Sequence, residues 1–253
     1  MELAPWDSDG GGAYLTGAIA KMSQKQLTTW LNFCIDGVVL SLPPTNATDR
    51  SNFVSQGDTH MFRKKTEVND PALAGKLVYA KQVDLDHAVP LWAGVGPKGF
   101  AGICFHPTKK LQVEEWVGCV QNHTLKRAIA SVNVRRGAKK GWRMLSDNEG
   151  FLGCPDSRSA LRKEMITLLQ IPAKSPDLNP IEKFWSWLRK QLRDLDSEDL
   201  RAGKPVPSRA SFERRVLKIC TSERGMQVAK SCFLGLPKVC AEVVANKGAM
   251  AKS

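Results

Sequence analysis

Ser175-Pro-Asp-Leu-Asn-Pro-Ile-Glu-Lys-Phe-Trp185 is the stretch of this sequence that decides the fold. It predicts the start of a helix, because Asn179 suits a helix cap, Pro180 suits the first helical position, and Glu182 can bond back to the cap amide. Apolar residues then recur at helical spacing and predict a stripe that packs on a sheet, formed by Ile181, Phe184, Trp185, Leu188, Leu192 and Leu195. Glu182 lies on the flank of this stripe, at the edge of the core.

Two aspartates in predicted strands accompany Glu182. Residues 142–147 fit a short strand that ends at Asp147, with 34 residues between Asp147 and Glu182, and residues 30–42 predict a buried strand with Asp36 in its middle. A carboxylate in an apolar strand is costly unless it is paired, hydrogen-bonded or bound to a metal. Asp36, Asp147 and Glu182 are therefore candidate ligands for Mg²⁺, which requires hard oxygen donors. The alternative is that Glu182 only caps its own helix.

The remaining apolar segments predict an α/β layered domain. The β-branched and aromatic runs between Gly and Pro predict further strands at 76–83, 89–95, 99–105 and 166–171. Helical spacing predicts helices at 111–132 and 157–165.

Composition divides the chain of 253 residues into three parts. Residues 1–28 are small and polar with a triple glycine, and we expect a flexible leader that ends in a short helix at 18–27. Residues 29–200 hold the three carboxylates and form one domain of catalytic size. Residues 201–253 are expected to form a basic loop with two prolines, followed by amphipathic helices.

The charge of the chain favours a polyanionic partner. With 37 Lys and Arg against 25 Asp and Glu, the formal net charge is +12, and nucleic acid is the commonest such partner. Residues 116–146 contain no acidic side chain, and this basic stretch leads directly to Asp147. The candidate phosphate contacts are Arg135, Arg136, Lys139 and Lys140 in this stretch, and Arg189 and Arg193 on the helix flank. The alternative is that these are solvated surface charges.

Cysteine content and hydropathy exclude several classes of protein. The seven Cys are odd in number and form no Cys-x-x-Cys pair, which argues against a disulfide framework and a structural zinc site and favours a reduced, intracellular chain. No apolar stretch approaches the ~20 residues that cross a bilayer, so no membrane association is expected.

The stretch 175–188 closely resembles the signature around the third carboxylate of mariner-superfamily transposases. Asp147-Asn148 at this interval resembles the second carboxylate position, and Asp36 in Phe-Cys-Ile-Asp-Gly resembles the first. The resemblance covers about residues 30–248. It implies an α/β fold of the RNase H-like kind, with a mixed five-stranded sheet flanked by helices.

The same resemblance implies a function and a set of partners. It implies cleavage and strand transfer on DNA that depend on Mg²⁺, for which Mn²⁺ substitutes, with Asp36, Asp147 and Glu182 as catalytic metal ligands. Asn148 and Asn179 hold supporting positions. DNA is the expected partner, a homodimer is left open, and no small-molecule cofactor is expected. For a eukaryotic host, the resemblance implies a nuclear location.

Three departures from the family keep alternatives open. Gly37 stands where the family more often carries an acidic residue, and Leu152 stands where many relatives carry a histidine. The family also usually places tandem helix-turn-helix modules before the catalytic domain, and we expect them to be absent here. The first alternative is therefore an inactive, domesticated or decayed remnant that only binds DNA. The second is another RNase H-like nuclease, such as a resolvase or ribonuclease, against which the 175–188 signature argues.

Overall fold

A mixed five-stranded sheet lies at the centre of the computed structural model, which describes residues 11–43, 88–105, 112–133, 141–147, 149–172 and 175–247. The strands have the order β3-β2-β1-β4-β5. They are β1 (Phe33–Ser41), β2 (Ala88–Gly96), β3 (Gly99–Phe105), β4 (Trp142–Ser146) and β5 (Ile166–Gln170). β1, β2 and β3 pair antiparallel, whereas β1, β4 and β5 pair parallel. The mixed sheet is thus confirmed, and the predicted strand at 76–83 lies outside the described residues.

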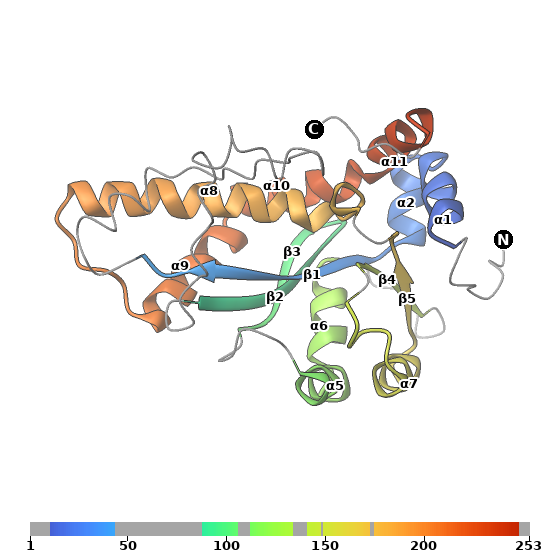
Figure 1. Cartoon of the computed structure of the whole chain (residues 1–253), viewed down its shortest axis with the longest axis horizontal. Coiled ribbons are helices and arrows are strands. Elements are labelled where there is room, and N and C mark those ends of the chain that lie inside the picture. Colours follow the sequence, from blue (N-terminus) through green and yellow to red (C-terminus); the bar gives the residue numbers. More distant parts are fainter. Residues whose placement is uncertain are drawn as a thin grey trace, which may run out of the picture.

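Helices cover both faces of this sheet (Figure 1). One face carries α8 (Pro180–Arg201), α9 (Arg209–Thr221), α10 (Glu223–Leu234) and α11 (Leu236–Ala245). The other face carries α5 (Val113–Gln121), α6 (Thr124–Ser131) and α7 (Pro155–Lys163). Each face therefore has its own apolar core, and β1 contributes to both.

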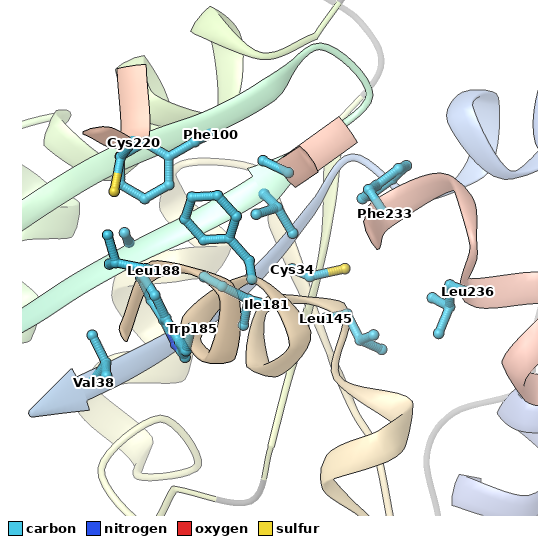
Figure 2. Packing of buried hydrophobic residues seen from close by; sticks show 14 of the residues in the cluster. Cys34, Val38, Phe100, Leu145, Ile181, Trp185, Leu188, Cys220, Phe233 and Leu236 are labelled. Carbon is cyan, nitrogen blue, oxygen red and sulfur yellow. The ribbon is translucent and has the colours of Figure 1, made fainter. Parts of the chain in front are cut away.

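Alternation of side chains along β1 decides which core each residue enters. Cys34, Val38 and Leu40 point to the face that α8 covers, whereas Phe33 and Ile35 point to the opposite core. Figure 2 shows the α8 face, with Cys34 and Val38 near residues of α8. Because Asp36 follows Cys34 by two residues, it lies on the α8 face as well.

The apolar stripe of α8 is buried almost as predicted. Ile181, Phe184, Trp185, Leu188 and Leu192 are buried against the sheet and its neighbouring helices, while Leu195 is only partly buried. Each fully buried side chain of this size contributes about 1.5–3 kcal/mol of transfer free energy. The stripe therefore anchors α8 across the strands (Figure 2).

The prediction of a flexible leader is wrong for residues 11–17, whereas the short helix predicted at 18–27 overlaps two helices. Residues 11–28 form α1 (Gly11–Ala20) and most of α2 (Gln24–Trp30), and Leu15, Ile19 and Leu27 are buried in the core of the α8 face. Ser23 and Gln26 cap α2 with reciprocal hydrogen bonds. α1 packs against α11, which is distant in sequence (Figure 1). The small residues of α1 permit this close packing but carry little local signal.

The single helix predicted at 111–132 is two helices, α5 and α6. The chain turns between them at His123, whose φ of 63° lies in the left-handed region. Asn122 stabilises the turn, because its Oδ1 accepts a hydrogen bond from the backbone N–H of Thr124 at 3.0 Å. Apolar spacing continues through the turn, so the break was not visible from periodicity.

The segment after residue 200 does not form a core of its own. Phe212, Val216 and Phe233 from α9 and α10 are buried in the same cluster as α8. The boundary at residue 200 as a unit of independent folding stays a prediction. Within the described residues, none of the helices has the length and apolar character needed to cross a bilayer.

Gly94 in β2 provides a test of the packing between β1 and β2. A Cβ at this position would collide with the buried ring of Phe33, so we expect Gly94→Ala to reduce the free energy of unfolding by about 1–3 kcal/mol. The matched control is Gly118→Ala in α5, where a Cβ has no neighbour within 4 Å and the helix gains stability. Chemical denaturation of both variants measures the difference. An unaltered Gly94→Ala midpoint would contradict this packing.

Candidate active site

Asp36 is a carboxylate held inside the central strand pair. Its residue is only 5% exposed. Oδ1 accepts a hydrogen bond from the backbone N–H of Gly37 at 2.7 Å, and Oδ2 accepts one from Nδ2 of Asn179 at 3.3 Å. The two oxygens of Asp36 are thus fixed by β1 itself and by the residue that precedes α8.

The register of the parallel pair β1 and β4 brings Asp147 next to Asp36. Phe33 pairs with Met144 and Cys34 pairs with Leu145. The ladder ends there, and two residues further along each strand Asp36 and Asp147 are close enough for the charge of Asp147 to shift the pKa of Asp36. Asp147 lies just beyond the end of β4, where Ser146 Oγ donates a hydrogen bond to its Oδ1 at 3.3 Å.

Glu182 belongs to this cluster and does not cap Asn179. The backbone N–H of Asn179, which a capping Glu182 would have to accept from, donates instead to the carbonyl of Pro176 at 3.1 Å. The Glu182 side chain hydrogen-bonds with Asp36. The alternative that Glu182 is only a helix cap is therefore wrong, and β1, β4 and α8 each contribute one carboxylate.

Burial and repulsion between neighbouring carboxylates disfavour the charged forms of Asp36 and Asp147. Burial raises the pKa of Asp36 to about 9, and the charges of Asp147 and Glu182 and the hydrogen bond with Glu182 act in the same direction. The pKa of Asp147 is also raised, first by burial, then by the charges of Glu149 and Glu182, against the lowering effect of the Ser146 hydrogen bond. Negative charge on the cluster is therefore unfavourable without a cation.

The three carboxylates are the type of ligand that a hard divalent cation prefers, but their side chains are not arranged around a common point. Three carboxylates are the oxygen ligands that Mg²⁺ and Mn²⁺ prefer, and the raised pKa of Asp36 marks an uncompensated negative site. Among the described residues, no group of three His, Cys, Asp or Glu side chains is arranged to hold a metal ion. Asp36 and Glu182 are in contact, whereas Asp147 interacts with both through its charge.

The predicted phosphate contacts are only partly covered by the structure. Arg189 and Arg193 lie on α8 about two and three helical turns beyond Glu182, so they share its side of the helix. Both are half-buried. Arg135, Arg136, Lys139, Lys140 and Asn148 lie outside the described residues. Their roles in binding stay predictions.

The departures at Gly37 and Leu152 are explained by packing on the far side of the sheet. A Cβ on Gly37 would lie 2.8 Å from the indole of Trp92, so no larger residue fits after Asp36 without a shift. Leu152 is fully buried in the same core as Trp92, on the face opposite the carboxylates. Both residues serve that core.

The contact between Asn179 and Asp36 was not predicted from the sequence. Local chemistry marks Asn179 as a helix cap, yet its side chain makes no cap hydrogen bond to α8. The alternation of side chains along β1 indicates that Asp36 points to one face of the sheet. It does not indicate that α8 begins on that face, because this depends on the order of the strands.

The fold is of the RNase H-like class, with the sheet order given above and carboxylates on its two central parallel strands. Solved structures with the same fold include a pre-cleavage Mos1 transpososome, with a TM-score of 0.59 and 13% identity over 100% of this chain and 68% of that chain. The catalytic domain of Mos1 mariner transposase aligns with a TM-score of 0.55 and 13% identity, over 99% of this chain and 100% of that chain. The predicted fold class is confirmed.

Residues 105–202 match the family model described as DDE superfamily endonuclease. The matched segment includes Asp147 and Glu182. Over 148 residues the chain is 23% identical to the Tcb1 transposase of Caenorhabditis briggsae, covering 57% of this chain and 50% of that protein. The Tc3 transposase of Caenorhabditis elegans is 27% identical over 148 residues, covering 57% and 42%.

These similarities in sequence and fold confirm the predicted relationship to mariner-type transposases. The matches span half or less of the length of the curated relatives, 50% of the first and 42% of the second. The activity of those whole proteins therefore comes to this chain only as a proposal.

The raised pKa of Asp36 predicts how stability depends on pH. In the unfolded chain this carboxyl releases its proton near 3.8, and in the folded chain it does so at about 9. Because the folded state binds more protons across this window, stability falls as pH rises through it. Without divalent cations, we expect Asp36→Asn to be more stable than the wild type at pH 8, by a margin that grows at most about 1.4 kcal/mol per pH unit.

Denaturant unfolding at pH 5 and pH 8 in a chelating buffer measures this margin. Asp194→Asn is the matched control, because it removes the same charge from an exposed position on α8. A variant at Asp36 that loses stability at pH 8 would contradict the repulsion described above.

Proposed function

We propose that this chain cleaves phosphodiester bonds of DNA and transfers the resulting strands, with Mg²⁺ or Mn²⁺ held by Asp36, Asp147 and Glu182. The observation that supports the proposal is the contact of Asp36 with Glu182, the interaction of both with the charge of Asp147, and the pKa of Asp36 raised to about 9. This arrangement is costly for folding and favourable for binding a cation. Perturbed groups of this kind are typical of functional sites.

Asp36, Asp147 and Glu182 would hold two divalent ions, which would supply activation of the attacking water or 3′-hydroxyl and stabilisation of the leaving oxygen. Asp36 would give up the proton that burial retains on it when a cation binds. The choice of metal is supported by solved Mos1 structures whose titles name Mn and Mg.

DNA is the proposed substrate and partner. The net charge of +12 favours binding to a polyanion, and Arg189 and Arg193 extend from Glu182 along α8. Contacts of this type neutralise phosphates without reading bases. Structures titled as the Mos1 paired end complex and the Mos1 Strand Transfer Complex support the same substrate. A homodimer, and a nuclear location in a eukaryotic host, belong to the same proposal.

Nicking of supercoiled plasmid tests the proposal directly. With Mg²⁺ or Mn²⁺ the wild type should convert supercoiled DNA to nicked circles, and chelation should abolish the conversion. Asp36→Asn, Asp147→Asn and Glu182→Gln should each reduce the rate roughly 100-fold or more, since even outer-shell partners of a metal are worth about 10–100-fold. Asp194→Asn on the exposed side of α8 should leave the rate unchanged.

The catalytic proposal fails if the wild type does not nick DNA, or if Asp147→Asn nicks as fast as the wild type. Binding of the inactive wild type to the same plasmid would instead support the alternative of a remnant that only binds DNA.

A further inference from the structure

Asn179 occupies the N-cap position of α8, but its side chain makes no hydrogen bond to the helix. It is only 1% exposed, and its backbone has the extended conformation usual for a cap. The side-chain oxygen of an asparagine in this position normally accepts from a backbone N–H of the first helical turn. Here the backbone N–H of Glu182 donates to the backbone carbonyl of Asn179 at 3.1 Å, and the side chain of Asn179 turns away to Asp36.

The turn away from the helix leaves one strong acceptor unsatisfied. Oδ1 of Asn179 is buried and has no hydrogen-bond partner among the described residues. An orphaned buried acceptor costs about 1–3 kcal/mol, and the lost cap costs about 1 kcal/mol more. A residue with a role in stability alone would recover both by rotating back to α8.

The orientation of the amide follows from the chemistry of Asp36. A carboxylate that binds a metal can only accept hydrogen bonds, so Asn179 must present its NH₂ group to it. Nδ2 does so at 3.3 Å from Oδ2. The carbonyl Oδ1 of the same amide is then left as an acceptor beside the carboxylate cluster. Hydrated Mg²⁺ carries water molecules whose O–H groups need acceptors of this kind.

We propose that Asn179 is a positioning residue for the metal site, in which Nδ2 orients Asp36 and Oδ1 accepts a hydrogen bond from a water bound to the cation. The inference rests on the proposed function, because it assumes that Asp36 is a metal ligand. It adds a residue whose amide acts on the cation through Asp36 and through water.

Calorimetric titration of Mg²⁺ and Mn²⁺ into the full chain tests this role without reference to activity. Asn179→Ala and Asn179→Ser should both weaken binding by about 10–100-fold, as loss of an outer-shell partner does. Serine can still cap α8, so Asn179→Ser should recover thermal stability but not metal affinity. Ser208→Ala is the matched control, since Ser208 caps α9 by accepting from the N–H of Ser211 at 3.3 Å. It should lower the Tm and leave metal binding unchanged.

Asp147→Asn separates this inference from the proposed function. If Asp147→Asn loses metal binding and both Asn179 variants keep it, only the role of Asn179 is overturned, and an ordinary buried water satisfies its oxygen. If Asp147→Asn binds Mg²⁺ as the wild type does, the metal site itself fails. If Asn179→Ala does not fold, the serine variant decides the outcome.

A second, independent observation concerns the thiols of Cys104 and Cys119, which join β3 to α5. Their sulfur atoms lie 3.9 Å apart in a thiol–thiol hydrogen bond, and both residues are half-buried. The hydrogen bond with Cys104 lowers the pKa of Cys119 to about 7, against the raising effects of burial and Glu115. A substantial share of Cys119 is therefore thiolate near neutral pH, which is the reactive form.

We infer that Cys104 and Cys119 form an oxidation site that closes to an intramolecular disulfide with hydrogen peroxide as the oxidant. The thiolate of Cys119 attacks one peroxide oxygen, giving a sulfenic acid and hydroxide. The sulfur of Cys104 then attacks the Cys119 sulfur, and the sulfenic oxygen leaves as water. Two thiols are oxidised, one peroxide is reduced, and two water molecules result.

Peptide mapping after treatment of the full chain with peroxide tests this site. A Cys104–Cys119 linked peptide with the loss of two hydrogens is expected, and Cys104→Ser or Cys119→Ser should abolish it. Cys34 and Cys240 are the internal control, because they interact with each other but are buried and have raised pKa values. Absence of the linked peptide, or equal linkage of Cys34 to Cys240, would overturn the inference.

Discussion

The structure depends on one costly constraint, which is a carboxylate in the middle of the central strand of an otherwise apolar sheet. β1 pairs with β2 at Asp36 and is covered on both faces, so Asp36 is only 5% exposed to water. Burial alone disfavours its charge, and carboxylates from β4 and α8 add repulsion. Three neighbours lie close to Asp36. β4 pairs with β1 just before it, the first turn of α8 carries Glu182, and the side chain of Asn179 donates a hydrogen bond to it.

The packing of α8 on the sheet also determines where its carboxylate lies. Ile181 and Trp185 are fully buried beneath α8, so Glu182 between them is directed to the flank that faces Asp36. On the far side of the sheet, Trp92 lies against Gly37 and shares a core with Leu152. Gly37 and Leu152, which depart from the family pattern, therefore pack in the core on the far side of the sheet and not on the face that carries the carboxylates.

Local patterns predicted most of the strands and the start of α8, because apolar periodicity is strong there. They failed where the stabilising partner is distant in sequence. α1 is rich in Gly and Ala and is held by α11, and the break at His123 depends on a single left-handed residue within continuous apolar spacing. The three carboxylates could be predicted, but the parallel register that aligns Asp36 with Asp147 could not. Asn179 was predicted as a cap because local chemistry says nothing of Asp36.

The distribution of basic residues indicates what the carboxylate cluster binds. Two other carboxylates with little exposure are paired with basic side chains: Glu164 with Lys126, and Asp199 with Lys204 and Arg215, and in each the partner lowers the pKa. Among the described residues, no basic side chain is among the groups that shift the pKa of Asp36 or Asp147. Burial and the neighbouring carboxylates disfavour the charged form of Asp36, and the proposed divalent cation would stabilise that form, because such ions prefer carboxylate oxygens.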